Sequence, residues 1–130
     1  MKELFVKLIL VSLMAFPMAS VFAAESLPLS VVLPELPPNQ EMLVLEVNLE
    51  PGQGSSPHRH NAYVFVYVLE GKVNMQVEGE EMVTLSPGEM FYENPDNVHM
   101  VSQNASDTET AKFLVHMVRT AGTPVSIPVE

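Results

Sequence analysis

Between residues 41 and 120 the chain alternates apolar and polar residues in short runs. Because successive side chains of an extended strand point to opposite sides, strict alternation predicts a β-strand with one buried face. In EMLVLEVNLE, residues 41–50, the apolar face holds Leu43, Leu45, Val47 and Leu49. The run at 72–78 alternates in the same way, and further β-rich runs stand at 58–70, 82–85, 90–93, 98–104 and 111–120.

Glycine and proline separate these runs. The predicted turns and loops are PGQGSSP at 51–57, GK at 71–72, EGEE at 78–81, SPGE at 86–89 and NPDN at 94–97. No stretch carries a convincing helical period. Many short strands divided by turn signals predict an all-β fold, an antiparallel sandwich or jelly-roll barrel.

The first residues form a separate unit. Lys2 and Lys7 precede an apolar run from Leu8 to Phe16, and small or branched residues stand before Ala24. This pattern predicts a signal peptide at 1–23 and therefore a periplasmic or secreted protein. The alternative is an uncleaved membrane anchor, but the run is short for a span and Pro17 interrupts it. After cleavage we expect no membrane association.

The rest of the chain divides into three parts. Residues 24–40 are rich in proline, which predicts an extended segment that lies along the surface or on a neighbouring subunit. Residues 41–120 are the predicted barrel, and 121–130 form a C-terminal tail. The 130 residues contain no cysteine, so any metal site must use histidine, carboxylate or tyrosine. The net charge of −10 argues against nucleic acid as a partner.

Two histidines stand at the start of the most apolar run, HRHNAYVFVYVLE at 58–70. His58 and His60 are two residues apart, so on a regular strand they share a face and converge on one point, as metal ligands do. The same parity places four small apolar residues beside them, and we expect these to line a substrate pocket: Ala62, Val64, Val66 and Val68. His99, which follows the NPDN turn, is a candidate third ligand.

These residues resemble the two motifs of the cupin family. Gly52, His58-x-His60 and Gly71 match the first motif, and Gly88 to His99 is similar to the second. In the second, Asn94 and Asp96 replace the usual proline and glycine, and Gln103 replaces the terminal asparagine. The resemblance covers roughly residues 41–119. It implies a cupin-type double-stranded β-helix, a fold that hosts many activities as well as binding proteins without turnover.

One departure from the motif bears on function. In metal-binding cupins a glutamate follows the second histidine by four residues, and here that position is Val64. The resemblance therefore implies a three-histidine site of His58, His60 and His99, with Fe(II) as the first expected metal and Mn, Ni or Zn as others. Such a site predicts an oxygenase that acts on a small anionic substrate, because no carboxylate reduces the charge of the metal. The alternative is a binding or sensing protein that has lost the metal.

Three further features leave alternatives open. His116 can be a fourth inward histidine, although an ordinary strand histidine fits it better. Tyr92 and Glu93 lie near the second motif and are the nearest candidates for an acid or base. The outward stripe Tyr63, Phe65 and Tyr67 is too apolar for bare solvent, and it predicts a homodimer or a cover by the N-terminal segment.

Overall fold

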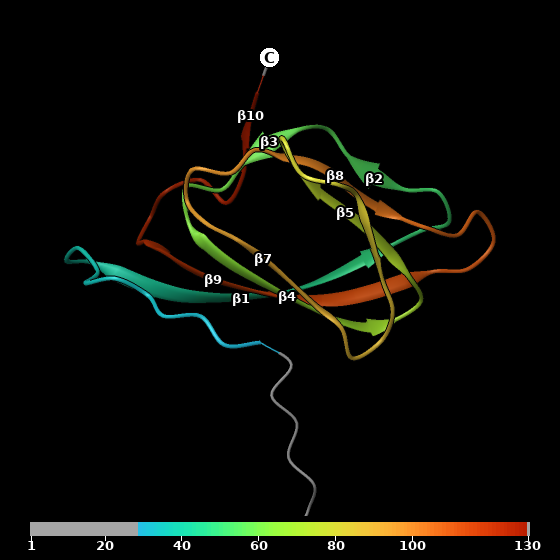
Figure 1. The fold of residues 1–130 in the computed structure, drawn as a ribbon, viewed down its shortest axis with the longest axis horizontal. Coiled ribbons are helices and arrows are strands. Elements are labelled where there is room, and N and C mark those ends of the chain that lie inside the picture. The colour runs from blue at the N-terminus through green and yellow to red at the C-terminus, as the bar shows by residue number, and fades with distance from the viewer. Residues whose placement is uncertain (1–28, 130) are drawn as a thin grey trace, which may run out of the picture.

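The computed structural model describes residues 29–129, and every regular element in them is a β-strand. Two antiparallel sheets face each other, one below and one above in Figure 1. The prediction of an all-β antiparallel barrel is confirmed. Within the described residues no helix has the length and hydrophobicity needed to cross a membrane.

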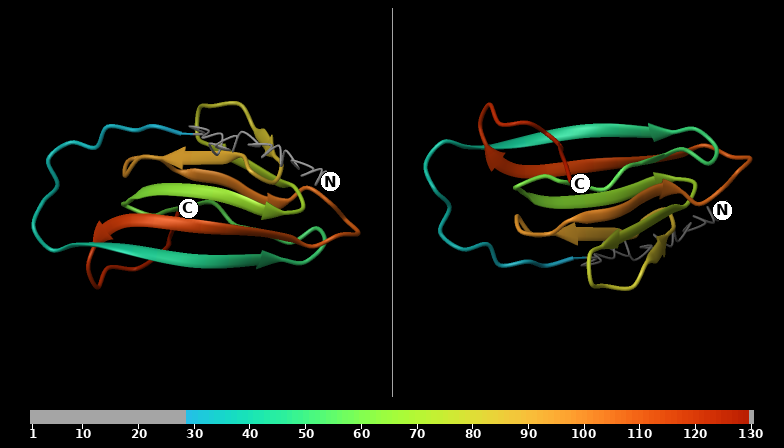
Figure 2. Two further views of the ribbon diagram at one scale, coloured as in Figure 1. Left: turned by 90° about the horizontal axis from the view of Figure 1, so that it is seen from below. Right: turned by 90° about the horizontal axis from the view of Figure 1, so that it is seen from above.

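The lower sheet has four strands. Their order is β1 (Gln40–Leu49), β9 (Ala111–Thr120), β4 (Tyr63–Glu70) and β7 (Met90–Glu93). Figure 2 shows these strands running side by side. β1 and β9 pair without interruption from Gln40↔Thr120 to Leu49↔Ala111, so the alternation read from both sequences places their apolar residues on one common inner face.

The upper sheet has shorter strands. Its order is β10 (Ile127–Pro128), β3 (His58–Arg59), β8 (His99–Asn104), β5 (Val73–Val77) and β6 (Val83–Leu85), while β2 (Gly54–Ser55) also pairs with β8. The core fills the space between the two sheets. Its buried residues include Val64, Val66, Val68, Val73, Met75, Phe113, Val115 and Met117.

The run 58–70 is two strands rather than one. β3 belongs to the upper sheet and β4 to the lower sheet, and the chain crosses between them at residues 60–62. Asn61 has a φ of 50°, a left-handed conformation that asparagine tolerates better than most residues. The crossing carries His60 out of the regular ladder, and the even-numbered residues on either side stay buried.

The two ends of the described chain lie on the barrel. Residues 29–39 leave the start of β1, round one end of the sheets and run back along the edge opposite β1, as both views of Figure 2 show. The predicted signal peptide lies outside the described residues. At the other end, β10 pairs with β3 through Ile127↔Arg59 and Pro128↔His58. The segment read as a C-terminal tail therefore joins the sheet that carries the histidines.

Candidate metal centre

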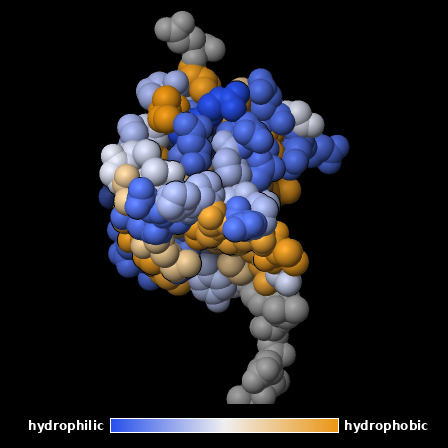
Figure 3. Space-filling model, turned by 90° about the vertical axis from the view of Figure 1, so that its left-hand side faces the viewer, coloured by the Kyte–Doolittle hydropathy of each residue, from blue (hydrophilic) through white to orange (hydrophobic). Residues whose placement is uncertain are grey.

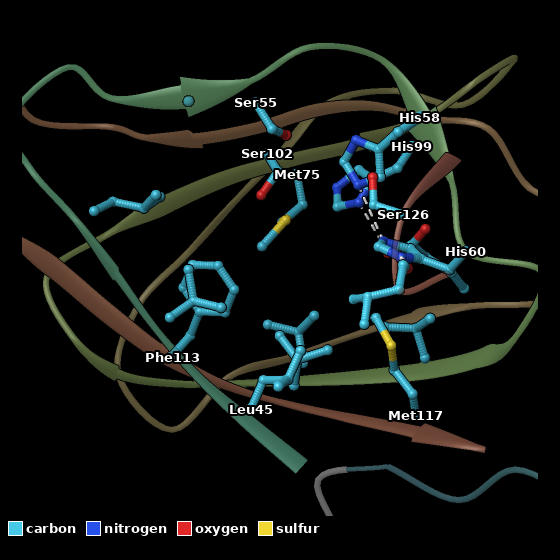
Figure 4. A pocket seen from close by; sticks show the side chains of 18 of the residues that line it. Leu45, Ser55, His58, His60, Met75, His99, Ser102, Phe113, Met117 and Ser126 are labelled. Atoms are coloured by element: carbon cyan, nitrogen blue, oxygen red, sulfur yellow. Dashed lines mark hydrogen bonds and ion pairs between the residues drawn. The ribbon is translucent and has the colours of Figure 1, made fainter. Parts of the chain in front are cut away.

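The structure brings the three predicted histidines together. One ring nitrogen from each of His58, His60 and His99 lies within 4.8 Å of the others. His58 on β3 pairs directly with His99 on β8, and His60 approaches from the crossing that follows β3. Figure 4 shows the three rings turned toward one another.

Two backbone carbonyls fix the orientation of two of these rings. His58 donates its Nδ1–H to the oxygen of Ser56 at 2.7 Å, and His60 donates its Nδ1–H to the oxygen of Val125 at 2.7 Å. A neutral imidazole carries a single N–H, so both Nε2 atoms are left with a lone pair. These two Nε2 atoms face each other at 3.1 Å.

Two facing lone pairs repel unless a cation lies between them. A proton is disfavoured at His60, because burial lowers its pKa below the usual 6.5. The bond to Val125 and the charge of Glu93 only partly oppose that effect. A metal ion suits the spacing, since two nitrogens at about 2.1 Å from one ion lie roughly 3.0–3.4 Å apart. The residues present therefore fit a divalent transition metal.

His99 completes the group from the upper sheet. Its Nε2 is buried and has no hydrogen-bond partner, as expected of a nitrogen that serves as a ligand. Its Nδ1 lies 3.0 Å from Oε1 of Glu93, and Phe91 stacks on its ring at 5.9 Å. The Nδ1 and Oε1 atoms are close but make no hydrogen bond, so the contact between them is electrostatic.

Glu93 is the site residue whose role the sequence did not reveal. Its side chain is only 2% exposed, and it pairs in register with Val64, the position where the motif lacks its glutamate. Directly paired residues of antiparallel strands point to the same face, so the carboxylate enters the same region from the neighbouring strand. The sequence does contain a signal for this inward glutamate. Phe91 and Glu93 share a face of the strand MFYE, so a phenylalanine that points inward implies that the glutamate does too.

A cavity of about 290 Å³ adjoins the histidines. Of the four predicted pocket residues, Val64 and Val66 line it, whereas Ala62 and Val68 are buried but are not among the lining residues. The wall also contains Val125 and Ser126, which come from the segment before β10. Strand parity can identify an inward side chain, but it cannot tell which inward residues border a void.

Other candidates lie away from the centre. His116 on β9 pairs with Val44 and Phe65 on the outer face of the lower sheet, apart from the three histidines. Tyr92 is on that outer face too, with its ring 5.3 Å from that of Phe65. Burial, with a smaller contribution from Tyr63, raises the pKa of Tyr92 above its usual 10.0. Neither residue is placed to act at the metal centre.

Two facing antiparallel sheets with three histidines between them define a double-stranded β-helix protein with a candidate metal site. The chain belongs to the cupin family, because the Cupin_2 model, which describes a cupin domain, matches residues 45–117. The expected family is thus confirmed. No curated protein matches the sequence at a significant level.

Solved structures show the same fold at low sequence identity. The DMSP lyase DddQ of Ruegeria pomeroyi is 19% identical with a TM-score of 0.57, over 64% of this chain and 41% of that one. The polyketide cyclase RemF of Streptomyces resistomycificus is 22% identical with a TM-score of 0.57, over 68% and 61%. A salicylate 1,2-dioxygenase of Pseudaminobacter salicylatoxidans is 25% identical with a TM-score of 0.53, over 58% and 21%. The chain thus spans less than two thirds of each.

Proposed function

We propose that this cupin is a metal-dependent oxygenase that holds Fe(II) through His58, His60 and His99 and acts on a small anionic substrate. The observation that carries the proposal is the 3.1 Å approach of two Nε2 atoms whose Nδ1–H groups are already bonded to carbonyls. The resemblance to a salicylate dioxygenase supports the reaction class by analogy only. Mn, Ni and Zn are the other ions that this donor set suits.

A bound divalent ion would supply a Lewis-acid centre, and iron would add redox chemistry with dioxygen. The protein supplies the rest. Ser56 and Val125 hold two imidazoles in the tautomer that presents Nε2 to the centre. Glu93 sits behind His99 and favours the ring orientation in which Nε2 faces the other histidines. The apolar wall opposite the histidines offers water no hydrogen-bond partner beside a bound substrate.

Metal titration of the purified protein tests this proposal. We expect the wild type to bind one divalent ion and His60→Ala to bind none, because two imidazoles rarely hold such an ion against buffer. Glu93→Gln should weaken binding by about 10- to 100-fold, the usual cost of losing a residue that orients a ligand. His116→Ala is the matched control, since it removes a histidine from the outer face and should bind as the wild type does.

The opposite outcome would favour the metal-free alternative. If the wild type takes up no Fe(II), Mn(II), Ni(II) or Zn(II), the chain is better read as a binding cupin whose apolar pocket holds its ligand unaided. If His60→Ala binds metal as tightly as the wild type, the three histidines are not the site. Oxygen uptake in the presence of thiols and catechols then separates turnover from binding.

We also propose that two copies pair through the outer face of the four-stranded sheet. Tyr63, Phe65 and Tyr67 are half-buried there, and Met42 and Val44 on the edge strand are 67% and 51% exposed. Figure 3 looks at one end of the molecule, and most of the apolar surface visible there lies in the lower half, on the side of this sheet.

Light scattering tests the pairing. Phe65→Glu with Tyr67→Glu should give a monomer, whereas Val83→Glu on the other sheet should not. A monomeric wild type would contradict the pairing.

Export is a further part of the proposal, and it rests on the sequence of residues 1–23 alone. The lysines and the apolar run that follows them support secretion to the periplasm or medium. Intact-mass measurement of the protein recovered from those fractions should give a chain that begins at Ala24. A mass that includes Met1 to Ala23 would contradict the cleavage.

A further inference from the structure

The cavity beside the histidines has two unlike walls. The six-stranded sheet and the loop before β3 contribute the polar groups, among them the side chains of Gln53, Ser55 and Ser102. The four-stranded sheet contributes only apolar groups apart from Glu93, and the members of this wall are Leu45, Val47, Leu49, Val64, Val66, Phe113, Val115 and Met117. Figure 4 shows Ser55 and Ser102 on one side of the space and Leu45, Phe113 and Met117 on the other.

The cavity wall contains very few charged side chains. Glu93 is the single charged side chain that borders the cavity, and no lysine or arginine of the described residues does so. Arg59 donates to the carbonyl of Asp96, and Arg119 pairs with Glu41. Lys112 lies near Glu46 and Glu70, away from the cavity. A ligand therefore meets no fixed positive side chain anywhere on these walls.

From these walls we infer the class of ligand that the pocket takes: a small molecule with an apolar body and at most one negative charge. The charged group lies at the histidine end, and neutral hydrogen-bonding groups face Ser55 and Ser102. This inference rests on the proposed function for the anchor of the charged group. A second carboxylate or a phosphate would be buried against aliphatic side chains without a partner, which is costly.

The size of the cavity narrows the class further. An apolar cavity of about 150 Å³ is known to accept a benzene ring. At about 290 Å³ this cavity has room for one ring with substituents or for a branched chain of similar bulk. Contact with Leu45, Phe113 and Met117 would stabilise such a body by removing apolar surface from water. Single-ring monocarboxylates are therefore suitable probes.

The test compares 4-methylbenzoate with terephthalate, which share a ring and one carboxylate and carry, at the para position, a methyl group and a second carboxylate respectively. Binding is measured by calorimetry on the Ni(II)-loaded and on the metal-free protein, after the metal content has been determined. We expect the loaded protein to prefer 4-methylbenzoate by at least about tenfold, because the second carboxylate finds no partner. Equal or tighter binding of terephthalate would overturn the inference.

A gain-of-function variant sharpens the comparison. Leu45→Lys places a cation in the apolar wall, on a half-buried edge strand that tolerates a long side chain, and it should raise the affinity for terephthalate relative to 4-methylbenzoate. The neighbouring Val44→Lys makes the same charge change on the outer face and should leave the preference unchanged. A shift of equal size in both variants would contradict a charge effect within the cavity.

The outcomes separate this inference from the proposed function. A wild type that binds Ni(II) but shows no preference for the monoanion refutes the ligand class and leaves the metal site standing. A wild type that binds no metal yet still prefers 4-methylbenzoate refutes the oxygenase and the metal anchor, and it supports the limit of one negative charge set by the apolar walls. Absence of both metal and ligand binding refutes both.

Discussion

In the four-stranded sheet, β1 and β9 pair over ten residues each without a break, whereas β2, β3 and β10 in the other sheet are two residues long. Two of the three histidines lie in strands of the second sheet, and His60 follows directly after one of them. In a continuous ladder the backbone carbonyls are occupied by the partner strand. Interrupted strands leave carbonyls such as those of Ser56 and Val125 free to orient imidazoles. Regular pairing thus provides stability here, and the interrupted strands provide the carbonyls that orient two of the three histidines.

The largest effect should come from a core residue of the regular sheet. Phe113 is 3% exposed on β9, so Phe113→Ala should lower the free energy of unfolding by about 3–5 kcal/mol. The folded variant should still bind metal, since no ligand is lost. Urea unfolding and metal titration check both statements. Lys112→Ala, next to it on the outer face, should change stability by no more than about 0.5 kcal/mol.

A smaller effect on stability is expected at the paired positions Val64 and Glu93, which belong to the four-stranded sheet and border the cavity. From the motif alone, restoring a glutamate at 64 would be expected to tighten metal binding. The register instead puts Val64→Glu beside a buried carboxylate, and this should cost about 1–3 kcal/mol in the metal-free protein. The double variant Val64→Glu with Glu93→Val should recover that loss of stability, because only one carboxylate then remains at the paired positions. Equal stability of the single and double variants would show that the two side chains do not meet.

Removal of the C-terminal segment tests how the six-stranded sheet alone contributes to metal binding. A chain that ends at Ala121 lacks the Val125 carbonyl that accepts from His60, so its metal affinity should fall by about tenfold or more while the four-stranded sheet stays intact. Ser126→Ala keeps the backbone and serves as the control. Unchanged metal binding in the truncated chain would mean that the His60 ring needs no carbonyl to orient it.

The parts predicted from sequence depend on local patterns, and the parts missed depend on contacts between distant segments. Alternation located β1, and β-rich runs divided by turn signals located β9 and, within the longer run 58–70, β4. The spacing of His58, His60 and His99 was enough to propose the site. The crossing at Asn61, the pairing of Glu93 with Val64 and the carbonyl of Val125 depend on which segments meet in space. A local pattern carries little information about such meetings.

The smallest expected effect is the dependence of the free energy of unfolding on pH. Burial lowers the pKa of His60 below 6.5 in the folded protein, so the unfolded chain takes up this proton first as the pH falls. Without metal, the free energy of unfolding should therefore decrease as the pH drops below about 6.5, and this dependence should end once the pH is below the folded pKa. His60→Gln removes the titrating group and should flatten that part of the profile, whereas His116→Gln on the regular sheet should keep it. Urea unfolding at a series of pH values between about 7.5 and 5 measures the difference. Identical profiles for the wild type and His60→Gln would show that burial at the crossing does not perturb this imidazole.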